Sequence, residues 1–168
     1  MATPTQISVE EYLSTSYRPD CDYLDGEVVE RNLGERDHGW LQMFVSAYIF
    51  NHYNDQGICP FTETRGQGKP KRFRIPDICV TVGFPDEKIF TKPPVLCIEI
   101  LSPEDRMKRA QERIDDYLQR GVPMVWILDP DTRRAYTATS VDGLREVKSG
   151  VLRTENPVFE LPLSEIFR

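Results

Sequence analysis

The chain lacks any long hydrophobic run: no apolar stretch in its 168 residues approaches the ~20 residues that cross a bilayer. The segment from Met1 to Tyr12 contains neither the basic region nor the apolar region of a secretory signal. The composition is otherwise ordinary for a soluble globular protein, with 39% hydrophobic and 29% charged residues. We therefore expect a cytoplasmic protein without a membrane partner, folded as a single domain over residues 1–168.

Cysteine pairs at metal-binding spacing are also missing. Cys21, Cys59, Cys79 and Cys97 form no C-x-x-C motif, so we expect reduced thiols rather than a zinc site or a disulfide framework. Positive charge is scarce as well: 21 basic and 27 acidic residues leave a net charge of −6. This balance disfavours a protein that coats nucleic acid through its overall charge, but it allows an enzyme with one local basic patch.

An apolar strand over residues 95–101 is the centre of the predicted fold. Its residues are apolar on both alternating faces, which is typical of a strand buried in the middle of a sheet. Glu99 interrupts this pattern on the face that it shares with Cys97 and Leu101. A buried carboxylate without a partner is costly, so it normally takes up a proton, forms an ion pair or binds a metal.

A helix and a second buried strand follow Glu99. Ser102, the proline after it and Asp105 form a strong helix start, with the acid three residues after the cap. Gly121 and Pro123 are typical of a helix end, and residues 124–128 are again apolar on both faces. This spacing of strand, helix and strand predicts a crossover between two parallel neighbouring strands.

A second acidic residue, Asp77, lies in a strand predicted over residues 74–82. If this strand pairs with the next one, Asp77 and Glu99 can meet on one face of the sheet. Two close carboxylates repel each other unless a proton or a cation lies between them. Carboxylate oxygens suit Mg²⁺ or Mn²⁺, and such an ion can activate water and neutralise charge on a phosphate.

Basic residues flank both acids. Segment 65–74 contains five basic residues, two glycines and no acid, so we expect a mobile cationic loop. Its candidates for nucleic-acid contact are Lys69, Lys71, Arg72 and Arg74. The helix after Glu99 carries arginines, Arg113 among them, along one border of its apolar stripe. The alternatives are an ordinary solvated loop at 65–74 and an ion pair of Glu99 that pins the helix to the sheet.

The remaining pattern predicts an α/β protein. A hairpin over residues 23–29, turning at Asp25-Gly26, is expected at one edge of the sheet. Asp37 is the expected N-cap of a helix over residues 38–53. His38 falls at the head of the buried stripe of this helix, as a core histidine or as a site residue. Further strands are expected near 58–64, 134–139, 144–147 and 151–153, with a terminal helical turn at 163–167.

These motifs together resemble the Uma-type restriction endonuclease family of the PD-(D/E)XK nuclease superfamily. The resemblance rests on 75–77 (I-P-D), 95–103 (V-L-C-I-E-I-L-S-P), Tyr117 with 121–123, and 126–130, and it also includes 23–30 and His38. It implies a restriction-endonuclease-like fold, in which helices flank a central mixed sheet. It also implies a nuclease site that binds a divalent metal, Mg²⁺ or Mn²⁺, through Asp77 and Glu99.

The chain departs from this pattern at two places. Leu101 stands where the superfamily has a lysine, and Arg113 stands where the family has a substitute lysine before the helix tyrosine. Asp22 is the nearest match to an acid that usually precedes the hairpin turn. The resemblance therefore implies catalytic roles for Asp77, Glu99, Arg113, Asp22 and His38 on a nucleic acid, most simply DNA. The alternative is a catalytically degenerate nuclease fold kept for nucleic-acid binding or assembly. A homodimer is also expected, since two sites related by twofold symmetry can cut both strands.

Overall fold

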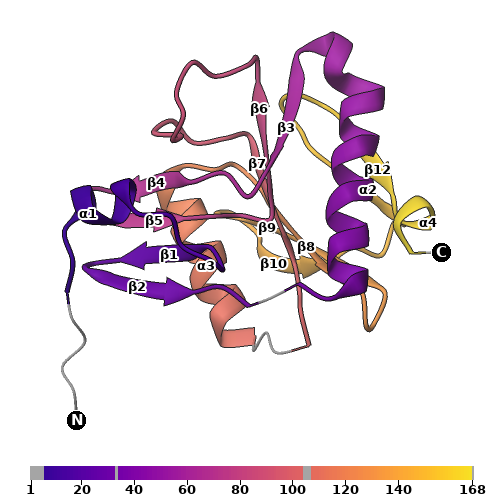
Figure 1. The fold of residues 1–168 in the computed structure, drawn as a ribbon. Helices are drawn as coiled ribbons and strands as arrows, with labels where there is room; N and C mark the ends of the chain where they lie inside the picture. The colour runs from indigo at the N-terminus through magenta and orange to yellow at the C-terminus, as the bar shows by residue number, and fades with distance from the viewer. Residues whose placement is uncertain (1–5, 33, 104–106, 168) are drawn as a thin grey trace.

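The computed structural model describes residues 6–32, 34–103 and 107–167 (Figure 1). Its centre is a six-stranded mixed sheet in the order β10-β9-β8-β7-β6-β3. The strands are β3 (Ile58–Thr62), β6 (Ile78–Val82), β7 (Leu96–Ile100), β8 (Val125–Asp129), β9 (Arg134–Thr139) and β10 (Gly143–Glu146). β7 and β8 are parallel, while the other neighbouring pairs are antiparallel. The parallel crossover predicted from the sequence is confirmed.

Helices cover both faces of this sheet. α2 (Arg36–Tyr53) packs on one face through Leu41, Val45 and Ile49. α3 (Met107–Arg120) packs on the opposite face, where Ile114 and Tyr117 lie in a separate core. All five residues of β7 are buried between these layers. The predicted fold class, a central mixed sheet flanked by helices, is therefore confirmed.

A second sheet of four strands, in the order β2-β1-β5-β4, forms the other half of the fold. Its strands are β1 (Cys21–Leu24), β2 (Glu27–Glu30), β4 (Gly66–Lys69) and β5 (Arg72–Arg74). Figure 1 shows α1 (Val9–Ser14) against this sheet, and Tyr12 packs there with Tyr23 and Phe73. Ser8 is the N-cap of α1, and its hydroxyl accepts a hydrogen bond from the backbone N–H of Glu11.

The C-terminal segment extends the core on the side of α2. β11 (Val151–Arg153) and β12 (Glu160–Pro162) form an antiparallel hairpin, and α4 (Leu163–Ile166) follows it. Leu161 and Ile166 join the apolar cluster beneath α2. The short 3-10 turn η1 (Asn54–Gln56) comes directly after α2. Among the described residues, no helix combines the length and hydrophobicity that a membrane crossing needs.

Two expectations about residues 65–82 are wrong. The segment 65–74 is not a loop, because β4 and β5 pair there as an antiparallel hairpin. The strand predicted over 74–82 is two strands in different sheets, and Asp77 lies between them, directly before β6. The alternation of apolar and polar residues continues across the gap between β5 and β6, so it does not reveal the gap. Pro76 does, because a proline has no backbone N–H to donate to a neighbouring strand.

Two further details differ from the sequence-based expectations. The hairpin that turns at Asp25-Gly26 belongs to the four-stranded sheet, not to an edge of the central one. α2 begins at Arg36, and its N-cap is Glu35 rather than Asp37. Asp105, the acid expected to support the start of α3, lies outside the described residues.

Candidate functional site

A polar cavity of about 120 Å³ lies where the two sheets meet α2 and α3. β1, β5 and β7 contribute walls, and the first turn of α2 and the middle of α3 contribute side chains. All five residues predicted to be catalytic line this cavity: Asp22, His38, Asp77, Glu99 and Arg113. Of the four basic residues predicted to contact nucleic acid, Arg74 alone is part of its lining.

The pairing of β6 with β7 places Asp77 beside Glu99. Ile78 lies opposite Ile98 in this antiparallel ladder, so the next position along places Asp77 opposite Glu99. The Asp77 carboxylate is 4% exposed. Its Oδ2 accepts a hydrogen bond of 2.7 Å from the backbone N–H of Ile100. The two acids therefore converge on one cavity, although only Glu99 lies within a strand.

Cations surround the buried Asp77. Arg31 Nη2 donates to Asp77 Oδ1 at 2.6 Å, and His38 Nε2 lies 3.2 Å from Oδ2. Burial alone favours the neutral acid, but His38, Arg31 and the N–H of Ile100 outweigh it and lower the pKa of Asp77 below 3.8. Burial also works against a charged His38, yet the contact with Asp77 outweighs burial and raises the pKa of His38 above 6.5. Asp77 is therefore ionised, with His38 as its partner.

Glu99 has the opposite character. The Tyr117 hydroxyl donates to Glu99 Oε1 at 2.5 Å, and Arg113 Nε forms an ion pair with Oε2 at 3.0 Å. Burial outweighs the attraction of Arg113 and, with repulsion from Asp77, raises the pKa of Glu99 from 4.5 to about 7. One acid of the pair is thus ionised at neutral pH, while the other is close to the point where it exchanges its proton.

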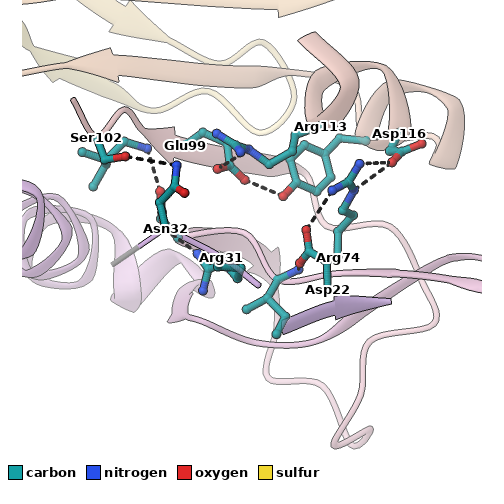
Figure 2. A network of polar contacts seen from close by, with 12 residues as sticks. Asp22, Arg31, Asn32, Arg74, Glu99, Ser102, Arg113 and Asp116 are labelled. Atoms are coloured by element: carbon teal, nitrogen blue, oxygen red, sulfur yellow. Dashed lines mark hydrogen bonds and ion pairs between the residues drawn. The ribbon is translucent and has the colours of Figure 1, made fainter. Parts of the chain in front are cut away.

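A chain of ion pairs forms the adjoining wall. Figure 2 shows Arg74 lying between Asp22 and Asp116, close to Glu99 and Arg113. Arg74 donates to Asp22 Oδ2 at 2.8 Å and to Asp116 Oδ2 at 2.8 Å. Asp22 Oδ1 also accepts from the backbone N–H of Ile75 at 3.0 Å. These bonds tie β1, β5 and α3 together at the side of the cavity.

The basic residues of the β4–β5 hairpin divide into two groups. Arg72 is partly buried and bonds to Asp25 at 2.6 Å and to Asp116 at 2.9 Å. Arg72 and the buried Arg74 are therefore structural cations in this conformation. Lys69 and Lys71 are exposed near the turn of the hairpin. Of the four predicted nucleic-acid contacts, these two lysines are the ones whose charges are open to a phosphate.

Several site residues were missed by sequence reasoning. Arg31 directly follows Glu30 at the end of β2, and no motif or period distinguishes it from a solvated charge. Tyr117 was part of the family resemblance, but nothing in its spacing identifies it as the partner of Glu99. Asn32 links the site to α3, since its amide donates to Ser102 Oγ at 3.4 Å and its carbonyl accepts from Arg109 at 3.4 Å.

The donor set suits a hard divalent cation. Asp77 and Glu99 supply carboxylate oxygens of the kind that Mg²⁺ and Mn²⁺ prefer. Within the described residues, no three His, Cys, Asp or Glu side chains cluster as ligands. An ion held by this pair would complete its coordination with backbone carbonyls, water or phosphate oxygens, as Mg²⁺ usually does. In this structure, the guanidinium of Arg31 is the cation bound to Asp77 Oδ1.

Comparison with known proteins fits this geometry. Residues 9–166 match the model of the Uma2 family, whose description is "Putative restriction endonuclease". The chain belongs to the Uma2 family. A similar solved structure is the crystal structure of a protein from Anabaena variabilis, described as a putative nuclease belonging to DUF820. The TM-score is 0.84, the identity is 20%, and the match covers 96% of this chain and 97% of the other. Among curated proteins, no sequence matches this one.

The Uma2 assignment confirms the resemblance inferred from the sequence motifs. The structural match confirms the fold, a mixed sheet with flanking helices that is shared with the protein described as a putative nuclease. In the Uma2 chain described here, the cavity between the two sheets contains acids at its centre and cations around them. This arrangement can bind a cation, hold a phosphate and exchange a proton at Glu99.

Proposed function

We propose that this Uma2 chain is a Mg²⁺- or Mn²⁺-dependent endonuclease that hydrolyses phosphodiester bonds of DNA. The observation that supports the proposal is the convergence of Asp77 and Glu99 on one cavity with opposite pKa shifts, lowered for the first and raised to about 7 for the second. Neighbouring titratable groups whose pKa values are shifted in opposite directions are characteristic of catalytic sites. The family description supports the reaction class, nucleic-acid hydrolysis.

In this proposal Asp77 and Glu99 hold the divalent ion. When bound, the ion supplies an activated water and offsets the negative charge that develops on the phosphate. Glu99 would have to be ionised to hold the ion, since a carboxylate binds a metal without its proton, and its raised pKa makes this condition pH-dependent. Arg113, which lines the same cavity, holds the phosphate, because a guanidinium stays protonated and cannot act as a base.

The other predicted residues support this pair. His38 holds Asp77 Oδ2 from the head of α2, so it orients the carboxylate. Asp22 bonds to Arg74 and to the N–H of Ile75, so it fixes the wall of the cavity rather than serving as an outer ligand. Lys69 and Lys71, exposed near the tip of the β4–β5 hairpin, contact phosphates along the DNA.

A plasmid-nicking assay tests the proposal. The wild-type protein is expected to nick supercoiled DNA with Mg²⁺ or Mn²⁺ and to stop when EDTA is added. Asp77→Asn and Glu99→Gln should each reduce the rate by at least ~100-fold, because each removes a charged ligand. Glu155→Gln, which changes an exposed acid on the loop after β11, is the matched control and should keep full activity. Equal cutting by wild type and both site variants would refute these assignments.

The second candidate is a nuclease fold that binds nucleic acid without cutting it. Arg113 at the position of the family lysine favours it, because an arginine cannot relay a proton. This candidate predicts salt-dependent DNA binding and no cleavage with any metal. Arg113→Lys separates the two. A large gain in nicking supports a degenerate site, whereas unchanged nicking supports an active arginine variant.

The proposal includes a homodimer, and α2 offers a surface for it. Trp40, Met43 and Phe50 are 55%, 50% and 53% exposed along one side of this helix. Together with Ala47 their spacing is symmetric about residue 45, so an antiparallel twofold pairing sets Trp40 against Phe50 and Met43 against Ala47. Light scattering after gel filtration should give the mass of a dimer, and Trp40→Glu should give a monomer. A monomeric wild type at high concentration excludes the dimer.

A further inference from the structure

Arg31 is the arginine of the candidate site that bonds directly to Asp77. It follows β2, in the segment that leads to α2, and its side chain is 17% exposed. Its guanidinium donates to Asp77 Oδ1 at 2.6 Å, the shortest contact between Asp77 and a side chain. Asp77, Glu99 and Asp22 all attract this charge. Arg31 thus compensates the carboxylates that would otherwise repel each other in a buried cavity.

The same oxygen is one that a divalent ion would need. Asp77 Oδ2 already accepts from the N–H of Ile100 and lies beside His38, so a divalent ion that leaves both contacts in place would bind Oδ1. Arg31 occupies Oδ1. A guanidinium and a divalent ion cannot both occupy one carboxylate oxygen at full strength, because the two positive charges would repel each other at close range.

The position of Arg31 in the fold allows it to leave. Arg113 projects from the middle of α3, and His38 belongs to the first turn of α2, so both are fixed by their helices. Arg31 instead lies outside the helices and strands, and its second contact, from Nη1 to Glu63 Oε1, is 3.9 Å long. Glu63 is half exposed, so the guanidinium has an acceptor in the direction of solvent.

We infer that Arg31 is the resident counter-ion of the metal-free site, and that it competes with the divalent cation for Asp77. This inference rests on the proposed function, since it requires a metal site at Asp77 and Glu99. It adds a requirement to that site: a divalent ion can bind only if the guanidinium of Arg31 leaves Asp77. The released guanidinium remains beside the cavity. Linkage makes the effect reciprocal. The factor by which a bound metal weakens the contact between Arg31 and Asp77 equals the factor by which breaking that contact strengthens metal binding.

Mn²⁺ binding to the full chain tests the competition. Free Mn²⁺ is measured by its electron paramagnetic resonance signal at pH 8, where Glu99 is ionised, and melting temperatures are recorded with and without Mn²⁺. Arg31→Gln is expected to bind Mn²⁺ on the order of tenfold more tightly than wild type. Without metal it should melt at a lower temperature, because Asp77 and Glu99 lose their shared counter-ion. Mn²⁺ should therefore raise its melting temperature by more than it raises that of wild type.

Arg120→Gln is the matched control. Arg120 is also partly buried, but its guanidinium donates to the backbone carbonyls of Phe90 and Lys92 rather than to the site carboxylates. This variant should melt earlier and bind Mn²⁺ as wild type does. If Arg31→Gln does not fold without metal, Arg31→Lys decides the question, since it keeps a charge but loses the planar fork. It should bind Mn²⁺ more tightly than wild type.

The outcomes separate this inference from the proposed function. If wild type binds Mn²⁺, Asp77→Asn does not, and the Arg31 variants bind no more tightly than wild type, the competition is refuted while the metal site stands. If no variant binds Mn²⁺, or Asp77→Asn binds it as well as wild type, the metal site itself is refuted, and the role of Arg31 with it. Tighter binding by both Arg31 variants, with an unchanged Arg120→Gln, supports the inference.

Discussion

Replacing Glu99 by glutamine should stabilise the protein at alkaline pH while removing one ligand of the proposed metal site. Glu99 is buried, and its pKa rises from 4.5 to about 7 in the folded state. Between these values the folded protein holds a proton that the unfolded chain releases. The stabilisation from this proton is fully present below pH ~4.5 and is lost as the pH rises to ~7. The introduced glutamine would resemble the protonated acid at every pH, so the variant lacks this loss.

The size of this free-energy difference follows from the pKa shift of Glu99. Each pH unit between the unfolded and folded pKa corresponds to ~1.36 kcal/mol. The rise from 4.5 to about 7 therefore makes ionised Glu99 unfavourable by roughly 3 kcal/mol above pH 7. The glutamine side chain retains a carbonyl oxygen for the hydroxyl of Tyr117, so the hydrogen bond at this position is kept. The variant should thus exceed wild type by roughly 3 kcal/mol at pH 8 and match it near pH 4.5.

Urea unfolding of both proteins at several pH values from 4.5 to 9 measures this difference. Asp77→Asn serves as a contrast, because Asp77 has a lowered pKa and its ionised form is the one the fold stabilises. That variant should lose stability at neutral pH. A Glu99→Gln variant that is less stable than wild type at pH 8, or a difference that does not change with pH, would refute the reasoning. A more stable but inactive variant would identify Glu99 as a functional rather than a structural acid.

Three further changes test other parts of the structure. Tyr117→Phe removes the hydrogen bond to Glu99 and should cost about 1–2 kcal/mol in urea unfolding at pH 6; an unchanged midpoint would contradict the contact. His38→Gln removes an ion pair whose stabilisation is complete below pH 6.5 and is lost as the pH rises through the raised pKa. Its stability deficit relative to wild type should therefore shrink at alkaline pH, and a constant deficit would argue against a protonated histidine. Ile98→Ala in the buried centre of β7 should cost about 2–5 kcal/mol, measured by thermal unfolding, and a loss below 1 kcal/mol would place Ile98 outside the core.

Local patterns predicted much of the fold because they reflect burial and capping. β7 and β8 are apolar on both faces, and both are buried between two layers of helices. Gly121 ends α3, as expected from the glycine and proline that follow the helix. Asp25-Gly26 forms the expected hairpin turn, in which both residues have positive φ. In each case the cause lies within a few residues of the element that it determines.

The site was only partly predictable because its partners are distant in the sequence. The run 65–74 itself contains no acid, so its basic residues are typical of a solvated loop. In the fold, Arg72 and Arg74 instead bond to Asp116, which lies on α3 more than 40 residues away. Arg31 likewise finds Asp77 across 46 residues. Only the folded arrangement of the two sheets reveals which basic residues are neutralised and which remain open.

The hydrogen bond from the N–H of Ile100 to Asp77 bears on how sequences of related proteins are interpreted. The Asp77 side chain accepts a hydrogen bond that a backbone carbonyl of a neighbouring strand would normally accept. It therefore stabilises the end of β7 whether or not any reaction takes place. In a related protein without catalytic activity, loss of this aspartate would still destabilise the end of β7. The presence of Asp77 in a sequence is therefore weak evidence for activity, because the residue also stabilises the fold. Glu99 destabilises the fold when it is ionised, so its presence is stronger evidence for activity.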